Sequence, residues 1–119
     1  MINPSQPNDE GLTALHNAVC ASKFDCVKYL VEFGCDINFG DHDGWTPLHC
    51  AASCNHLAIV RFLTEHGASI YATTNEENET PLEKCEREEE NYQNCSEYLC
   101  SKGEKELFFF VCNGIELLF

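Results

Sequence analysis

Apolar side chains recur along this chain at helical spacing, in segments separated by polar loops. Val27, Leu30 and Val31 stand at positions i, i+3 and i+4, so one face of a helix there would be buried. Val60 and Leu63 repeat the arrangement of Val27 and Leu30 further along the chain. Shorter stretches of small and apolar residues precede both segments. The pattern predicts four helices, over residues 13–21, 24–33, 47–53 and 57–65.

A turn and a capped helix start precede the first and the third of these helices. Thr13 and Thr46 can accept a hydrogen bond from a free amide of the first turn, and Pro47 occupies a position that needs no amide hydrogen. Gly11 and Gly44 stand at equivalent positions before the two threonines and permit a tight turn. The repeated signature consists of Gly11, Thr13, His16, Gly34, Gly44, Thr46, Pro47, His49 and Gly67.

A period of about 33 residues that carries the pattern T-P-L-H-x-A resembles the ankyrin repeat, a β-turn followed by two helices. The resemblance predicts an all-α fold, an ankyrin-repeat solenoid of about three repeats whose helix-turn-helix pairs are joined by β-hairpin-like finger loops. The predicted segments are the end of a degenerate or truncated preceding repeat at 1–10, repeats at 11–43, 44–76 and 77–103, and a divergent apolar C-terminal tail at 104–119.

The third repeat departs from the period. The interval from Thr46 to Thr80 is slightly longer than the interval from Thr13 to Thr46, and the interval from Leu63 to Leu99 is longer still. These intervals predict insertions in the finger loop and between the two helices. The run from Glu86 to Glu90 is too charged for a buried face. We expect a solvated helix end or an inter-helix loop there, with a partner-binding patch as the alternative.

The apolar tail at 104–119 is shorter than the ~20 residues that a membrane-spanning helix needs. It is expected either to cap the third repeat or to result from a truncated or misassigned reading frame.

The chain is strongly acidic, with a formal net charge of −13. This charge argues against direct binding to nucleic acid or to an anionic membrane, and it favours a protein partner with a basic surface. Nine cysteines would fit a disulfide scaffold, but the number is odd and the N-terminus has no signal-peptide pattern. Reduced thiols and a cytoplasmic or nuclear location are therefore expected.

Residues that could carry chemistry have structural explanations. His16 and His49 occupy equivalent positions, where an imidazole of an ankyrin unit bridges backbone groups of neighbouring fingers. Cys50 and Cys54 share a helix face and could offer two metal ligands, but no second pair has suitable spacing. No catalytic triad, paired catalytic carboxylates or phosphate-binding loop is present, so the sequence predicts no enzyme, no cofactor and no metal site.

The finger loops are the expected binding surface, because they project from the helices and differ between repeats. An aromatic residue among acids suits a docking site, although the tryptophan could equally pack beneath its own turn. The candidate partner-binding residues are Asp41, His42, Asp43, Trp45, Tyr71, Thr73, Asn75, Glu76 and Glu77.

Three stretches resemble one family more closely. They are 3–11 running into 13–18, then 43–55, then Glu83-Lys84-Cys85-Glu86 with Tyr92, Cys95-Ser96 and Leu99. Together they resemble the ankyrin region of the apoptosis-stimulating proteins, the ASPP family, which regulate a tumour-suppressor transcription factor. The third stretch is the most specific, since the general ankyrin pattern contains nothing like it.

The resemblance implies a non-catalytic module that docks on the DNA-binding domain of that transcription factor. It also implies a protein phosphatase catalytic subunit, NF-κB and Bcl-2 type proteins as further partners. Family members carry an SH3 domain after the repeats, so this chain resembles a truncated member. Two alternatives remain: a metal- or redox-responsive cysteine-rich protein, and a generic ankyrin scaffold with another partner.

Overall fold

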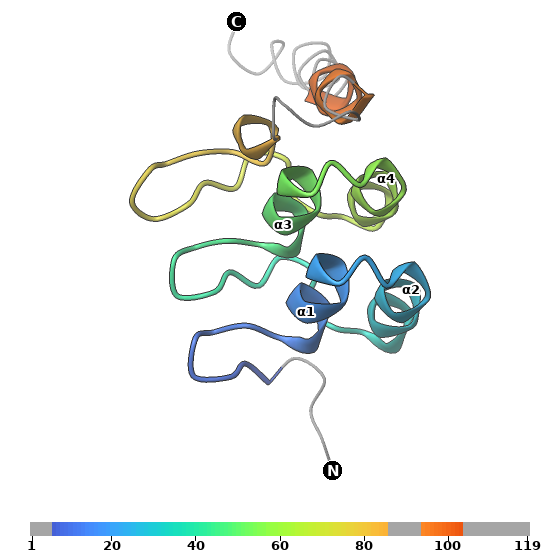
Figure 1. Ribbon diagram of the computed structural model, residues 1–119, viewed down its shortest axis with the longest axis vertical. Coiled ribbons are helices and arrows are strands. Elements are labelled where there is room, and N and C mark those ends of the chain that lie inside the picture. The colour runs from blue at the N-terminus through green and yellow to red at the C-terminus, as the bar shows by residue number, and fades with distance from the viewer. Residues whose placement is uncertain (1–5, 86–93, 104–119) are drawn as a thin grey trace, which may run out of the picture.

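The computed structural model describes residues 6–85 and 94–103 (Figure 1). Its elements are α1 (Ala14–Cys20), α2 (Phe24–Phe33), α3 (Pro47–Ser53), α4 (Leu57–Glu65), the short 3₁₀ helix η1 (Leu82–Lys84) and a helix over 94–103. No strand occurs within these two ranges. The ranges of α2, α3 and α4 equal those predicted from the hydrophobic pattern. Helix α1 is slightly shorter at each end than predicted, because Thr13 and Ala21 are its caps.

The helices stack in two layers. α1 packs against α3 in the inner layer, which lies next to the loops, and α2 packs against α4 in the outer layer (Figure 1). Each finger loop projects from the same side of the stack and leads into the next inner helix. The finger loops therefore form a row, and this row is the surface that the stacking of the units creates.

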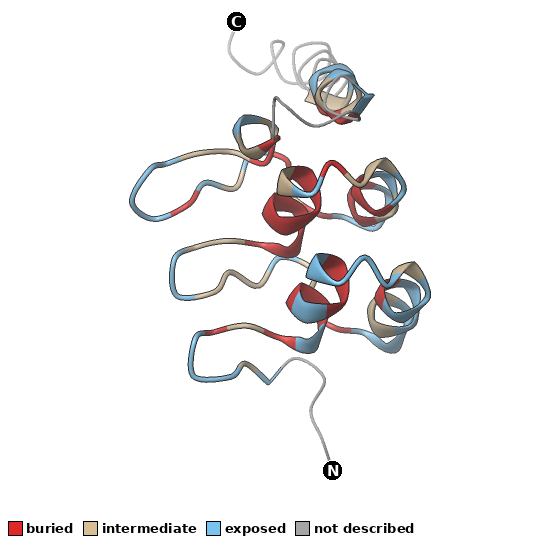
Figure 2. Cartoon of the chain, viewed as in Figure 1, coloured by how far each residue is buried: buried red, intermediate tan, exposed pale blue. Residues whose placement is uncertain are grey.

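The core lies between the two layers, and the finger tips are exposed (Figure 2). Leu15, Leu48, Ile59 and Leu63 are fully buried within it. The inner helix α3 is covered by neighbours on both sides, and all of its residues except Ser53 are buried. Small side chains such as Ala51 permit this close approach of helices. The inner layer is consequently the rigid base from which the fingers project.

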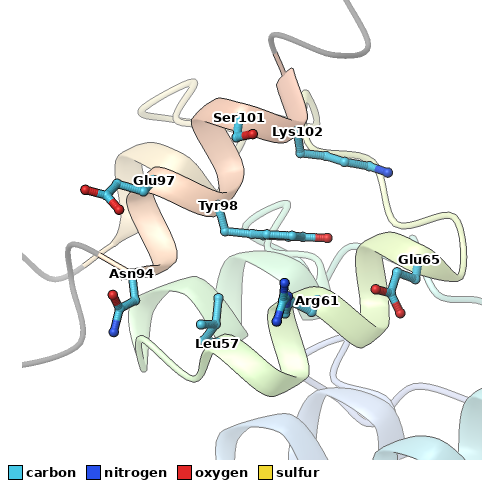
Figure 3. Close-up of a pocket in the computed structure, with 8 residues that line it drawn as sticks. All are labelled: Leu57, Arg61, Glu65, Asn94, Glu97, Tyr98, Ser101 and Lys102. Carbon is cyan, nitrogen blue, oxygen red and sulfur yellow. The ribbon is translucent and has the colours of Figure 1, made fainter.

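Aromatic side chains join the outer helices. The rings of Phe24 and Phe62 lie 5.6 Å apart between α2 and α4. At the equivalent contact with the helix over 94–103, the Tyr98 hydroxyl is 2.7 Å from Thr64 Oγ1, and the Arg61 guanidinium lies 5.4 Å from the Tyr98 ring centroid. Figure 3 shows Tyr98 directed toward α4, beside Arg61. The last helix is thus held on the same face as its predecessors.

The third unit begins differently from the other two. Thr80 is followed by Glu83, whose carboxylate accepts hydrogen bonds from the Thr80 amide and hydroxyl at 3.3 and 3.1 Å. The helical turn η1 then ends at Cys85, which has extended backbone (φ −58°, ψ 127°). The run at 86–90, expected to be a solvated helix end or an inter-helix loop, lies outside the described part of the chain. The apolar tail at 104–119 and the first five residues lie outside it as well.

Candidate functional site on the finger loops

Each finger loop is shaped by the side chain at its first position. The Asp41 carboxylate accepts hydrogen bonds from the amides of Asp43 and Trp45, both at 2.9 Å. The Asp41 amide in turn donates to the Trp45 carbonyl at 2.9 Å. Asn8 makes the same bonds in the first finger, with the amides of Glu10 and Leu12. Asp41 therefore holds its own loop closed, and its carboxylate is engaged within that loop.

The third finger is longer than the second. Its closing bond runs from the Thr74 amide to the Glu79 carbonyl at 3.0 Å, and the Glu79 amide donates to Thr74 Oγ1. Asn78 takes a positive φ of 54° to accommodate the added length. This insertion accounts for the extended interval between Thr46 and Thr80.

Adjacent fingers are hydrogen-bonded to each other. The His42 amide donates to the Glu10 carbonyl at 3.2 Å. The Asn75 amide donates to the Asp43 carbonyl, and Asn75 Nδ2 donates to the His42 carbonyl, both at 2.9 Å. A Cβ atom on Gly44 would lie 2.6 Å from Asn75 Oδ1. The glycine is thus needed for close approach as well as for its φ of 82°.

The repeated histidines join one helix start to the next finger. His49 Nδ1 accepts from the Thr46 amide at 3.1 Å, and its Nε2 donates to the Glu79 carbonyl at 2.9 Å. His16 bonds to the Thr13 amide and the Trp45 carbonyl in the same way. Burial lowers the pKa of His49, although hydrogen bonding to backbone carbonyls opposes the shift. The neutral ring thereby fixes the position of the loop.

A hollow of about 220 Å³ lies between the second and third fingers. The Trp45 ring is half-buried there, and Asp43, Glu76 and Glu77 are exposed around it. The lining residues are Asp43, Trp45, Thr74, Glu76, Glu77 and Lys84. The hollow therefore combines an aromatic surface with an acidic rim, and both fingers contribute to it.

Lys84 is the basic group of this hollow. Its Nζ lies 4.6 Å from the Trp45 ring centroid and pairs with the carboxylates of Glu77 and Glu79. The hydrogen bond to Glu77 is the main cause that raises the pKa of Lys84, and partial desolvation opposes it. Only 10% of the Lys84 side chain is exposed. The ammonium group thus stacks on the indole as a cation–π contact.

The candidate residues do not all lie together in the structure. Asp43, Trp45, Glu76 and Glu77 line the hollow together. Asp41, His42 and Asn75 shape or join the fingers through the hydrogen bonds described above. Thr73 is exposed. Tyr71 lies elsewhere, lining an apolar groove with Leu82 and Leu99 and donating from its hydroxyl to the Gly103 carbonyl at 3.2 Å.

Two residues that line the hollow, Thr74 and Lys84, are not among the partner-binding residues that the sequence predicts. Lys84 belongs to the repeat after that of Trp45, so the spacing of residues within one finger does not indicate the contact. The sequence indicates it only by a basic residue within an acidic segment.

A second, larger hollow of about 570 Å³ lies on the outer layer, between α4 and the helix over 94–103 (Figure 3). Arg61 and Lys102 line it together with Glu65 and Glu97, so charges of both signs surround it. Within residues 6–85 and 94–103, no cluster of three or more His, Cys, Asp or Glu side chains is arranged to hold a metal ion. No helix in this part is long and apolar enough to cross a membrane.

Stacked two-helix units with hydrogen-bonded fingers define an ankyrin-type repeat solenoid, a class of non-catalytic protein-interaction modules. The family model described as "Ankyrin repeats (3 copies)" matches residues 1–74. The chain belongs to the ankyrin-repeat family, which confirms the predicted fold class.

Two relatives that match most of the chain are ASPP-type regulators. The chain is 52% identical over 99 residues to RelA-associated inhibitor of Mus musculus, covering 83% of this chain and 12% of that protein. It is 56% identical over 103 residues to Apoptosis-stimulating of p53 protein 2 of Homo sapiens, covering 87% of this chain and 9% of that protein. These identities confirm the resemblance to the ASPP ankyrin region. The chain spans about a tenth of the length of these relatives.

A shorter similarity is to Protein phosphatase 1 regulatory subunit 27 of Homo sapiens, at 49% identity over 45 residues, which are 38% of this chain and 26% of that protein.

Proposed function

We propose that the chain is an ASPP-type docking module that binds a basic protein surface through its second and third fingers. The partner class is the DNA-binding domain of a transcription factor. The names of the two ASPP-type relatives point to p53 and to RelA as the proteins to test first. Binding there would mask or redirect the partner, and no reaction is catalysed.

The observation that carries this proposal is the hollow between the two fingers. The side chains of Asp43, Glu76 and Glu77 line it together with Lys84 and the Trp45 ring, and the Lys84 ammonium pairs with Glu77 and Glu79. An aromatic anchor inside a charged rim is the usual composition of a protein-binding hot spot. The rim attracts a basic surface over a distance, so it speeds encounter more than it deepens affinity.

A salt titration tests the proposal. The chain is titrated against the p53 DNA-binding domain and against RelA at ionic strengths from 50 to about 300 mM, and affinity is expected to fall steadily as screening increases. Glu76→Lys places a positive charge on the exposed rim and is expected to weaken binding about tenfold, mainly through a slower association rate.

Glu32→Lys is the matched control, because it makes the same charge change on an exposed position of α2. It is expected to change affinity by less than about twofold. Equal losses in the two variants would attribute binding to net charge rather than to the hollow. An affinity that does not change with ionic strength, or no binding to either partner at low salt, would contradict the proposal.

The similarity to a protein phosphatase 1 regulatory subunit favours a second candidate, the phosphatase catalytic subunit. The same titration with the phosphatase catalytic subunit distinguishes the two candidate partners. If the phosphatase subunit binds away from the fingers, Glu76→Lys would leave its affinity for the chain unchanged. A cytoplasmic or nuclear location fits either partner. No disulfide links the cysteines of residues 6–85 and 94–103, which is the state that reducing compartments maintain.

A further inference from the structure

The hollow between the second and third fingers already holds a cation that the chain itself supplies. The Lys84 Nζ lies 4.6 Å from the centroid of the Trp45 ring and 2.9 Å from the Glu79 carboxylate, and it also pairs with Glu77. Only 10% of the Lys84 side chain is exposed. The ammonium group therefore occupies the aromatic surface on which a basic partner would make its contact.

The ankyrin pattern does not account for this cation–π contact. Leu12 stands at the position of the first repeat that matches Trp45, and Cys50 stands at the position of the second repeat that matches Lys84. The units stack with a leucine or a cysteine at these positions, so the repeat needs neither the indole nor the ammonium. The pair belongs to this one junction between fingers.

Two carboxylates at the rim of the hollow are not neutralised. Asp43 and Glu76 line the hollow and are exposed. Among residues 6–85 and 94–103, neither of them pairs with a basic group, and the Lys84 ammonium lies with Glu77 and Glu79 instead. The hollow of about 220 Å³ that these side chains line is large enough to admit a side chain from a partner.

We propose that the hollow receives an arginine side chain of the partner, and that its guanidinium displaces the Lys84 ammonium from the Trp45 ring. This inference rests on the proposed docking function, because it names the side chain that the docked surface presents. Lys84 is an internal competitor, and it sets the affinity and the specificity of the site.

The chemistry of the two cations favours the exchange. A guanidinium is planar and weakly hydrated, so it stacks on an indole and donates two parallel hydrogen bonds to a carboxylate such as that of Asp43 or Glu76. An ammonium is a compact and strongly hydrated charge, which gains more from a return to water. A partner's arginine therefore replaces Lys84, whereas a partner's lysine would exchange one ammonium for another without gain.

The displacement of Lys84 has a small cost. The Glu77 side chain is 62% exposed, and an ion pair with an exposed partner contributes little to stability. The Lys84 amide donates to the carbonyls of Thr80 and Pro81, so the backbone of η1 keeps its hydrogen bonds when the side chain moves. The flexible stem of the lysine lets its ammonium turn outward into water.

The test follows Trp45 directly, because it is the only tryptophan of the chain. The indole N–H resonance of the isotope-labelled full chain is recorded during titration with acetyl-Gly-Arg-Gly-amide at constant ionic strength. A saturable shift of this resonance is expected. The affinity for the arginine peptide should exceed that for acetyl-Gly-Lys-Gly-amide by about threefold or more.

Removal of the competitor is the decisive variant. Lys84→Ala leaves the ring uncovered and is expected to raise the affinity for the arginine peptide about fivefold, because the binding-competent state is then fully populated. Lys28→Ala is the matched control, since it removes the same charge from an ammonium that lies 5.4 Å from the centroid of the Phe24 ring on α2. It is expected to change the affinity by less than about twofold.

Trp45→Leu copies the residue of the first repeat and keeps the net charge. Followed through the backbone amide resonances of Asp43 and Glu76, this variant is expected to bind both peptides with equal, lower affinity, because the rim alone does not distinguish the two cations. This variant keeps the inference testable if Lys84→Ala is unstable.

Equal affinities of the wild type for the two peptides would overturn the inference. So would an affinity that does not rise in Lys84→Ala, or one that rises equally in Lys28→Ala. The proposed function fails separately, if neither p53 nor RelA binds a chain that takes up the arginine peptide as expected.

Discussion

The side chains that recur most regularly in this chain support its architecture. His16 and His49 look like candidate ligands or acid–base groups in the sequence, but each ring is buried and has both nitrogens occupied by backbone partners. The His49 ring is held in the neutral form, because Nδ1 accepts a hydrogen bond while Nε2 donates one. A proton added to Nδ1 of His49 would remove the bond from the Thr46 amide.

Stability is therefore expected to fall as the pH drops through the range in which an exposed histidine titrates. Burial holds the pKa of His49 below its ordinary value of 6.5, so below about pH 6.5 the unfolded chain takes up a proton that the folded chain does not. The free energy of unfolding should decline by up to about 1.4 kcal/mol per pH unit from this group. Urea unfolding at pH 7.5, 6.5 and 5.5 measures the decline.

His49→Gln should reduce this slope at the cost of lower stability at pH 7.5. His42→Gln is the control, since the His42 side chain is exposed, and it should keep the wild-type slope. An unchanged slope in His49→Gln would disprove the explanation.

At the level of elements, the finger loops depend on contacts with one another. Gly44 and Gly34 both take a positive φ, of 82° and 103°, but only Gly44 is crowded by the next finger. Asn75 occupies the space that a Cβ on Gly44 would need, whereas nothing lies within 4 Å of a Cβ on Gly34. A substitution at Gly34 therefore measures the cost of backbone strain alone, whereas one at Gly44 adds the cost of disturbing the packing of the fingers.

Gly34→Ala is expected to cost about 1 kcal/mol of stability, the strain of a left-handed alanine. Gly44→Ala should cost about 2–4 kcal/mol, because the third finger must also shift. Urea unfolding of both variants gives the comparison. If the two losses were equal, Asn75 would not be packed against Gly44 in solution.

The elements were predictable where their signals are local. Caps and i, i+4 spacing lie close together in the chain, so the ranges of α2, α3 and α4 could be derived from the sequence alone. The elements of the third unit were harder to predict from the sequence. Glu83 replaces the histidine at the cap, and η1 ends after a single turn at Cys85, so the register of its helices could not follow from the period.

In the molecule as a whole, the outer layer has aromatic side chains that no described residue covers. Tyr29 is the first-repeat equivalent of Phe62, the residue that packs on Phe24 of the preceding helix. Tyr29 itself is 66% exposed and Phe33 63% exposed, with their rings stacked 6.0 Å apart. Exposed aromatic pairs of this kind favour association between molecules.

The double variant Tyr29→Lys with Phe33→Glu is expected to reduce self-association in sedimentation experiments at high protein concentration. It should change the free energy of unfolding by less than about 0.5 kcal/mol, because both side chains are exposed. The double variant Lys28→Glu with Glu32→Lys retains both rings and the net charge, and should associate like the wild type. Equal association in both variants would contradict this prediction.

The period, the caps, the helices and the acidic character could be read directly from the chain, because each rests on neighbouring residues or on composition. The contacts of Lys84 could not. Lys84 stacks on Trp45 of the preceding repeat and pairs with Glu77 and Glu79. Such contacts exist only once the units have stacked, since the rotation between units decides which side chains face each other.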